Sequence, residues 1–333
     1  MRTDEPSTTP RVVAVGRQED AVDVERAVFE AAGIELETHP RPGNAELPAS
    51  IRTADGILHS SWDLTADVIE QLRCRVIGRY GIGYDNIDVE AATEQGIAVV
   101  NVPGYCVDEI AEHVLAFTLA WHRCLPFYDR DRFAASDLER PRSAPTHRIA
   151  DLTGGLCAFG DIARGVAARW QALGMDVLSF DPYVPTEDFA AHGVTQVSFE
   201  DLLAASDVVS VHTPLTDETR QLIDADAFDR MQSHALLVNT ARGEVVHTGD
   251  LLAALRRGAI AGACLDVVAG NDDEQQALRD RPDVLLTPHI AYLSEQSVRD
   301  LHEGAATGVR DVLEGRRPPG LVNPAVTDAQ LFD

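Results

Sequence analysis

The sequence predicts an α/β fold built from two doubly wound parallel sheets. Short apolar runs of strand length alternate with amphipathic stretches of helical spacing, which is typical of parallel strands joined by helices. The chain has 333 residues, 45% of them hydrophobic, and this is more than one core usually holds, so two domains are expected. Several strands end at glycine or at a polar residue, as in sheets that bind ligands at the carboxyl ends of their strands.

The first domain is expected to hold five strands and to be discontinuous in sequence. The predicted strands are Val12–Val15, Glu35–Thr38, Gly56–His59, Val76–Arg79 and Ala98–Asn101, and the predicted helices are Ala21–Ala32 and Thr65–Leu72. A last amphipathic stretch, Ser294–Glu314, must bury its apolar face, and we expect it to do so by packing on the first domain. The prediction is therefore one domain of residues 1–102 plus 293–333 and a second of residues 103–292.

At the start of the second domain the sequence predicts a long helix, Val107–Arg123. Its second half is apolar on nearly every side, so this helix is expected to be buried within the chain or against a second subunit. Residues 129–148 are charged and irregular, and we expect a loop or lid there.

After this helix and loop, the second domain has a strand–turn–helix–strand pattern that ends at an acid. An apolar run, Leu156–Phe159, leads to a turn at Gly160; a second run, Val177–Phe180, ends at Asp181, about 20 residues after that glycine. This layout is typical of a dinucleotide-binding βαβ unit, although only the middle glycine of the G-x-G-x-x-G fingerprint is present. On these residues alone, an ordinary βαβ crossover with an incidental acid is an equal alternative.

Four further strands each end near a chemically capable residue. The predicted strands are Val208–Val211, Ala235–Val238, Ala261–Leu265 and Val284–Leu286, and the residues that follow them include Thr213, Arg242, Asp266 and His289. Because the carboxyl ends of parallel strands meet at one edge of a sheet, these side chains and Asp181 are expected to line one crevice.

The charge of the chain is strongly negative. Acidic residues number 54 against 28 basic residues, all of them arginine, which gives a formal net charge of −26. Such a surface repels nucleic acid and anionic membranes, so neither is expected as a partner. The acids are spread along the chain, which favours adaptation to a salt-rich cytoplasm over the alternative of a merely acidic enzyme.

Cysteine usage and the absence of targeting signals indicate a cytoplasmic protein. The five cysteines are scattered without metal-ligand spacing, which indicates a reducing compartment and no metal site. Neither a signal peptide nor a stretch of transmembrane length is visible in the sequence.

Several long motifs resemble those of one enzyme family. RYGIGYDNID, NVPGYCVDEIAEH, VSVHTPLTDETR, LLVNTARGE, AGACLDV and LLTPHIAYLSEQS are similar to segments of the D-isomer-specific 2-hydroxyacid dehydrogenases, most nearly of the branch with the C-terminal-binding-protein-like dehydrogenases. The resemblance runs from about residue 10 to 325. It implies a flavodoxin-like substrate domain and a Rossmann domain, with NAD and a small 2-keto acid in the cleft between them. It also implies a homodimer, for which helix 107–123 is the expected interface.

The resemblance also implies roles for individual residues. Arg242 would bind the substrate carboxylate and polarise the carbonyl, since a guanidinium matches a carboxylate bidentately. His289 would be the general acid/base. Asp181 would bind the adenosine ribose hydroxyls and so favour NAD over NADP. The other implied cofactor contacts are Phe159, Gly160, Asp161, Ile162, Thr213, Pro214, Thr219, Thr240, Ala241 and Asp266, and the implied substrate contacts besides Arg242 are Gly81, Ile82 and Gly83.

Purely structural roles are the alternatives for the two catalytic candidates. Arg242 could be a surface arginine paired with an acid, and His289 could be a structural histidine at a strand end. Their positions directly after predicted strands, inside long motifs, favour the catalytic roles. His212 matches a family position beside the cofactor rather than the acid/base.

The sequence departs from the family pattern in three places. Where the family has the glutamate that pairs with its histidine, this chain has Asn271 if one counts from Asp266, or Gly270 if one counts back from His289, and the nearby acids Asp272, Asp273 and Glu274 are out of register. Ala158 and Asp161 replace a glycine and an arginine beside the expected pyrophosphate, and Asp161 brings an anion close to it. The segment LTGGLCAFG is shorter than the family's equivalent, which predicts a truncated first strand.

These observations predict an NAD-dependent oxidoreductase that acts on a small 2-keto or 2-hydroxy acid of D configuration. The alternative is a catalytically weak relative that binds nucleotide or partner proteins as a scaffold. A serine-pathway phosphoglycerate dehydrogenase is a third possibility, which we expect less because 333 residues leave no room for a further regulatory domain.

Overall fold

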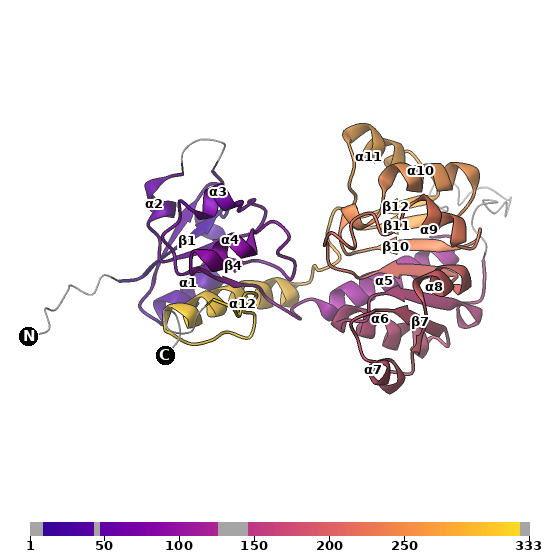
Figure 1. Ribbon diagram of the computed structural model, residues 1–333, viewed down its shortest axis with the longest axis horizontal. Coiled ribbons are helices and arrows are strands. Elements are labelled where there is room, and N and C mark those ends of the chain that lie inside the picture. The colour runs from indigo at the N-terminus through magenta and orange to yellow at the C-terminus, as the bar shows by residue number, and fades with distance from the viewer. Residues whose placement is uncertain (1–8, 43–46, 126–145, 327–333) are drawn as a thin grey trace, which may run out of the picture. The chain divides into compact units, whose positions relative to one another are not determined.

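The computed structural model describes residues 9–42, 47–125 and 146–326 (Figure 1). They form two compact units, one of Met1–Tyr105 with Ser294–Asp333 and one of Cys106–Leu293. Each unit has one sheet in which every strand pairing is parallel, and this confirms the predicted fold class. The loop expected at 129–148 lies mostly outside the described residues.

The sheet of the first unit has the strand order β2-β1-β3-β4-β5. This is the flavodoxin-like order. Its strands are β1 (Arg11–Val15), β2 (Glu35–His39), β3 (Gly56–His59), β4 (Val76–Arg79) and β5 (Ala98–Val100). Alternate residues of the strands other than the edge strand β2 enter two separate cores, so Val12 and Ala14 lie in one and Val13 and Val15 in the other. Both faces are therefore covered, which explains why the strands other than β2 are mostly apolar.

Short helices and the long C-terminal helix cover this sheet. The helices are α1 (Asp23–Glu30), α2 (Ala49–Arg52), α3 (Ala66–Ile69), α4 (Val89–Glu94) and α12 (Glu295–Leu313). In Figure 1 the yellow α12 lies along the violet elements of this unit, and it packs on α1, β3 and β4. Gly78 of β4 makes this approach possible, since a Cβ there would lie 2.5 Å from Val309 of α12.

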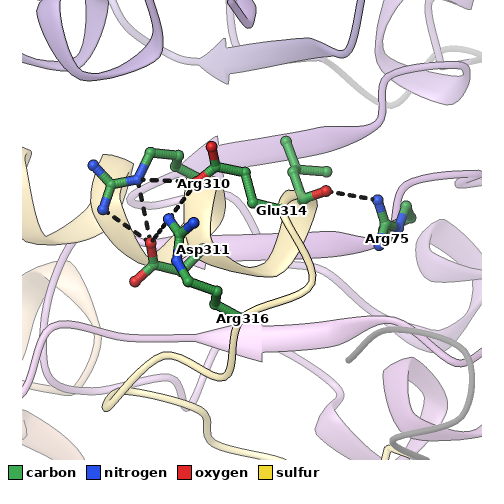
Figure 2. A network of polar contacts seen from close by, with 6 residues as sticks. Arg75, Arg310, Asp311, Glu314 and Arg316 are labelled. Atoms are coloured by element: carbon green, nitrogen blue, oxygen red, sulfur yellow. Dashed lines mark hydrogen bonds and ion pairs between the residues drawn. The ribbon is translucent and has the colours of Figure 1, made fainter. Parts of the chain in front are cut away.

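The C-terminal end of α12 is fixed by arginines (Figure 2). Arg75, next to β4, donates from Nη1 to the carbonyl of Leu313 at 3.0 Å. Asp311 pairs with Arg310 at 2.9 Å and with Arg316 at 2.6 Å. Cations at this end of a helix also interact favourably with its dipole. Helix α12 is thus held to the rest of the first unit by packing and by polar contacts.

The sheet of the second unit has the strand order β12-β11-β10-β9-β6-β7-β8. The chain starts at β6, adds β7 and β8 on one side, and then returns to add the other four strands on the opposite side. This is the Rossmann arrangement, with its switch point between β6 and β9. The strands are β6 (Thr153–Cys157), β7 (Asp176–Phe180), β8 (Thr195–Gln196), β9 (Val208–Val211), β10 (Leu236–Asn239), β11 (Gly262–Leu265) and β12 (Val284–Leu286).

Helices cover both faces of this second sheet. They are α5 (Val107–His122), α6 (Asp161–Ala172), α7 (Thr186–Ala191), α8 (Phe199–Ala205), α9 (Ala225–Arg230), α10 (Thr248–Arg257) and α11 (Asp272–Arg279). One face of α5 is buried within its own unit, where it packs on α6 and β10. The ring of Trp121 covers Gly262, at which a Cβ would lie 1.9 Å from the ring. No helix in the described part of the chain is both long and apolar enough to cross a membrane.

The prediction of a truncated first strand in this unit is wrong. Strand β6 has five residues and begins at Thr153, earlier than the apolar run that suggested it. Gly154 and Gly155 belong to the strand because its neighbours come very close: a Cβ at Gly154 would lie 2.3 Å from Trp170, and one at Gly155 would lie 2.2 Å from the hydroxyl of Ser206. Glycine here serves packing, which a search for apolar side chains does not detect.

Candidate functional site

The carboxyl ends of six neighbouring strands lie at the same end of the second unit's sheet. Because these strands are parallel and hydrogen-bonded in the order given above, their carboxyl ends lie side by side. The predicted site residues follow these ends: Asp181 after β7, Gly160 after β6, Thr213 after β9, Arg242 after β10, Asp266 after β11 and His289 after β12.

The turn after β6 leaves an uncapped helix N-terminus beside open space. Gly160 is the N-cap of α6 and has no side chain to cap it, so the first amides of the helix, at Asp161 and Ile162, point out of the helix end. A Cβ placed on Gly160 would meet no atom within 4 Å among the described residues. Such a helix end binds phosphate groups through its amides and its dipole, so it fits the pyrophosphate of a dinucleotide.

Two side chains make this turn less favourable for an anion. Ala158 adopts a φ of +86°, a left-handed conformation that favours glycine, which is the residue that the fingerprint has there. Asp161 is exposed at the first position of α6, where its charge lies close to the space that a pyrophosphate would occupy.

Phe159, one of the predicted cofactor contacts, supports the turn from inside. Its ring is fully buried and stacks on Phe189, with 4.6 Å between the centroids. The guanidinium of Arg164 lies over the same ring, and its Nε donates to the Phe159 carbonyl at 3.1 Å. The amide of Phe159 donates to Asp181 at 2.9 Å, so this residue links the turn to the end of β7.

The carboxylate of Asp181 is held in place by two backbone amides. Oδ2 accepts from Phe159 and Oδ1 accepts from Tyr183, both at 2.9 Å. Each carboxylate oxygen can accept a second hydrogen bond, so the free lone pairs can still accept from ribose hydroxyls. The side chain is thus oriented before any ligand binds.

The loops after β9 and β10 contain two buried hydroxyls without partners. Neither Thr213 Oγ1 nor Thr240 Oγ1 has a hydrogen-bond partner within the described part of the chain, although both atoms are buried. Since buried hydroxyls are normally paired, these two atoms fit a site that a polar ligand completes. Thr219 donates to the carbonyl of Pro214 at 2.5 Å and so closes the loop after β9.

The turn that presents Arg242 is built by a buried asparagine. Asn239, only 1% exposed, accepts from the amide of Ala241 at 3.0 Å and donates to the carbonyl of Arg242 at 2.8 Å. Gly243 allows the turn to pack on the next loop, since a Cβ there would lie 2.4 Å from the nitrogen of Ala269. Asn239 is not among the predicted site residues; its position at the end of a buried strand was the available signal.

Asp266 holds the loop that carries His289. Its Oδ1 accepts from the Thr287 hydroxyl at 2.5 Å and from the amide of Ile290 at 2.9 Å, and its Oδ2 accepts from the amide of Ala291 at 2.9 Å. The amide of His289 donates to the Asp266 carbonyl at 2.9 Å. His289 is exposed, and its backbone has a φ of +56°.

Asn271, the residue that we matched to the family glutamate, is the N-cap of helix α11. Its side chain accepts from the amide of Glu274, and the Glu274 carboxylate accepts from the amide of Asn271, each at 3.0 Å. This is a capping box. Both side chains therefore have a structural role in starting the helix. The sequence signal was the spacing of an asparagine and a glutamate three residues apart.

His212 differs from His289 in its surroundings. Its Nε2 lies 2.9 Å from the hydroxyl of Ser210, and burial lowers the pKa of His212 to about 3. This imidazole therefore stays neutral at physiological pH, which makes it unsuitable as a proton donor.

Gly81, Ile82 and Gly83 lie in the first unit, directly after β4. The carbonyl of Ile82 accepts from the Asn101 side chain at 2.7 Å, and the carbonyl of Gly81 accepts from the amide of Val102 at 3.1 Å. Gly81 has a φ of +145°. The loop is thus fixed through its carbonyl groups.

Comparison with known proteins places the chain in a family. Residues 115–291 match the model of the D-isomer specific 2-hydroxyacid dehydrogenase NAD binding domain. The structure is similar to a D-lactate dehydrogenase from Sporolactobacillus sp., with 34% identity and a TM-score of 0.69, over 91% of this chain and 96% of that one. It is also similar to a D-lactate dehydrogenase from Aquifex aeolicus complexed with NAD and lactic acid, with 27% identity and a TM-score of 0.82 over the same shares.

A curated relative is longer than this chain. The D-3-phosphoglycerate dehydrogenase of Archaeoglobus fulgidus is 36% identical over 319 residues, which cover 94% of this chain and 59% of that protein. The chain spans less than two thirds of the length of such relatives. The narrower likeness to the C-terminal-binding-protein-like branch stays a prediction. By the domain match and by the likeness over nearly whole chains, this protein belongs to the D-isomer specific 2-hydroxyacid dehydrogenase family, and its second unit contains the family's NAD-binding domain.

Proposed function

We propose that this protein is an NAD-dependent oxidoreductase that transfers hydride between NAD(H) and a small 2-keto or 2-hydroxy acid of D configuration, in the cytoplasm. The observation that carries the proposal is the strand order of the second unit. It brings Arg242, Asp266 and His289 to three adjacent strand ends on the sheet edge where the nucleotide-type turn at Gly160 also lies.

The cofactor-binding residues fall into two groups in this proposal. The helix end at Gly160, Asp161 and Ile162 binds the pyrophosphate, and Asp181 accepts from the adenosine ribose. The loops after β9 and β10 bind the rest of the cofactor through Thr213, Pro214, Thr219, Thr240 and Ala241. When bound, NAD supplies the nicotinamide ring that gives or takes the hydride.

The substrate is bound and activated by the chain's own polar groups. Arg242 binds the carboxylate through two parallel hydrogen bonds and polarises the neighbouring carbonyl. As the hydride reaches the carbonyl carbon, His289 gives a proton to the carbonyl oxygen, and in the reverse direction it takes the hydroxyl proton. The predicted binding of the carboxylate by Gly81, Ile82 and Gly83 belongs to the same proposal.

Asp181 determines the choice between NAD and NADP in this proposal. Its carboxylate would lie where NADP has a 2′-phosphate, and two negative charges at contact distance repel each other strongly. We therefore expect NADH to bind at least about tenfold more tightly than NADPH at high salt.

The experiment that tests the function separates an enzyme from a scaffold. NADH is titrated by fluorescence in about 2 M KCl, and small 2-keto acids, pyruvate among them, are then added. The reverse direction is followed with NAD and the D and L forms of lactic acid, and with D-3-phosphoglycerate. Turnover with a keto acid and with one D acid supports the proposal. NADH binding without any turnover would instead support the nucleotide-binding scaffold, and oxidation of L acids alone would refute the configuration.

The proposed assembly is a homodimer through helix α5. One face of α5 is buried in its own unit, while Leu115, Leu119 and Ala120 on its other side are only partly buried. Sedimentation in molar KCl tests the assembly, and a monomer at micromolar concentration would contradict it.

A further inference from the structure

A chain of hydrogen bonds connects helix α5 with the loop that carries His289. His113 of α5 has its Nε2 3.1 Å from the Thr287 hydroxyl, and that hydroxyl lies 2.5 Å from Asp266 Oδ1. Asp266 in turn accepts from the amides of Ile290 and Ala291 at 2.9 Å. All of these residues belong to the second unit.

The direction of each hydrogen bond follows from the groups involved. A carboxylate only accepts, so the single proton of the Thr287 hydroxyl points to Asp266. The hydroxyl oxygen then accepts from His113, whose Nε2 must carry the proton. Burial lowers the pKa of His113, and the charge of Asp266 opposes this only in part. The imidazole is therefore neutral at neutral pH and is fixed in one tautomer.

The His113 ring is itself held in a defined position. It meets the ring of Phe117, one helical turn further along α5, edge to face, with 4.4 Å between the centroids. Such pairs have a preferred geometry, so the direction of the Nε2–H bond is set by the helix.

The loop at the other end of the hydrogen-bond chain needs external support. His289 has a φ of +56°, a conformation that costs a residue with a Cβ about 1–2 kcal/mol. Such a backbone persists only where its surroundings determine it. Here the support comes from Asp266, which is 2% exposed and accepts three hydrogen bonds from the loop.

We propose that His113 is a positioning residue, which holds the His289 loop in its productive conformation through Thr287 and Asp266. The inference rests on the proposed role of His289 as proton donor. Without the His113 donor, the Thr287 side chain is held from one side only and can change its rotamer, so that the loop loses one of its three hydrogen bonds to the Asp266 carboxylate. A small displacement of His289 lowers kcat because proton transfer requires close contact, while cofactor binding at the other strand ends is unaffected.

The test compares three single variants in about 2 M KCl. His113→Leu removes the donor, and His113→Gln keeps an N–H donor of similar reach. His234→Leu is the matched control, because His234 also donates to a partner, Asp207 Oδ1 at 2.6 Å, but before β9 and β10, at the amino ends of the same sheet. The readouts are amide hydrogen exchange at Ile290 and Ala291, which needs no activity, and kcat and KM with NADH and a keto acid.

The expected result is a specific loss in His113→Leu. Exchange at the two amides speeds up about tenfold and kcat falls about tenfold, with KM for NADH unchanged. His113→Gln recovers most of both losses, and His234→Leu shows neither of them.

Unchanged exchange at Ile290 and Ala291 in His113→Leu would overturn the inference, and so would faster exchange with an unchanged kcat. If the wild type itself reduces no keto acid while exchange still speeds up, the support of the loop stands and the proposed function fails. Should His113→Leu not fold, Thr287→Val removes the same link with an almost identical shape. Wild-type exchange in that variant would overturn the inference equally.

Discussion

At Ala158 the chain has an alanine in a backbone conformation that favours glycine. Its φ of +86° brings the Cβ close to the preceding peptide group, at a cost of about 1–2 kcal/mol. Glycine would remove that cost but would lose more entropy on folding, about 0.5–1 kcal/mol. The two effects oppose each other, and the steric effect is the larger.

We therefore expect Ala158→Gly to stabilise the fold by up to about 1 kcal/mol. It should also tighten NADH binding, because the turn can then approach the pyrophosphate more closely. Urea unfolding and NADH titration in molar KCl measure both effects. The control is Ala168→Gly at an exposed position in the middle of α6, which should cost about 1 kcal/mol. An equal loss of stability in the two variants would contradict the strain argument.

Asp161 is expected to weaken cofactor binding. Its carboxylate lies at the helix end that would bind the pyrophosphate, so Asp161→Asn should lower the Kd for NADH several-fold, and more so at low salt. Asp272→Asn is the control, because Asp272 is the first residue of α11 as Asp161 is of α6. Both variants lose the same favourable helix-end interaction, but only the first should change NADH binding. If both leave the Kd unchanged, the pyrophosphate does not bind near Asp161.

The sequence predicted sites at Arg242, Asp266 and His289, but not the hydrogen bonds by which Asn239 and Asp266 hold the loops of the other two. Arg242 and His289 each lie three residues after the end of a strand in a recognisable motif, and a position near a strand end can be inferred from local pattern. The hydrogen bonds that hold these loops depend on which strands are neighbours in the sheet. Asp266 reaches the loop after β12 only because β11 pairs with β12, and that register is a tertiary feature.

At the scale of elements, long helices and buried strands were predicted well, and packing-dependent boundaries were not. The predicted strand Val208–Val211 has the observed bounds, because three of its four residues are valine, which is apolar and β-branched. Strand β6 begins earlier than predicted because Trp170 and α8 pack so close to Gly154 and Gly155 that no side chain fits there. Strand β8, only Thr195–Gln196, is too short for any periodic signal.

Helices α1 and α12 of the first unit are joined by a buried polar cluster. Glu25 of α1 is 1% exposed and accepts from Tyr80 and from His302 of α12, both at 2.6 Å. Burial raises the pKa of Glu25, but the hydrogen bonds from His302 and Tyr80 outweigh it, and the pKa lies below its usual 4.5. A carboxyl with a depressed folded-state pKa stabilises the fold above its unfolded pKa, and this contribution is lost as the pH falls through the folded-state value.

Glu25→Gln should therefore destabilise the protein by about 2 kcal/mol at neutral pH. The difference from wild type should shrink as the pH falls below about 4.5, the usual glutamate value. Urea unfolding of both proteins across this pH range measures it. Glu30→Gln, at an exposed position of the same helix, is the control and should change stability little. A difference that stays constant with pH would show that Glu25 carries no charge in the folded protein.

For the whole molecule, the net charge of −26 governs how stability depends on salt. Repulsion among 54 acidic residues acts over a Debye length of about 10 Å at 0.1 M salt and about 3 Å at 1 M. The compact state should therefore gain stability with salt. We expect the Tm to rise steadily from low to molar KCl, as measured by circular dichroism. A flat or falling Tm would contradict adaptation to a salt-rich cytoplasm.

The most direct test of the central claim is keto-acid reduction by Arg242→Lys beside wild type. Lysine keeps the charge but cannot make two parallel hydrogen bonds to a carboxylate, so turnover should fall by about 100-fold while the Kd for NADH stays nearly unchanged. Arg256→Lys on the exposed side of α10 is the matched control and should behave like wild type. Full activity of Arg242→Lys would remove Arg242 from the active site, and with it the proposed mechanism.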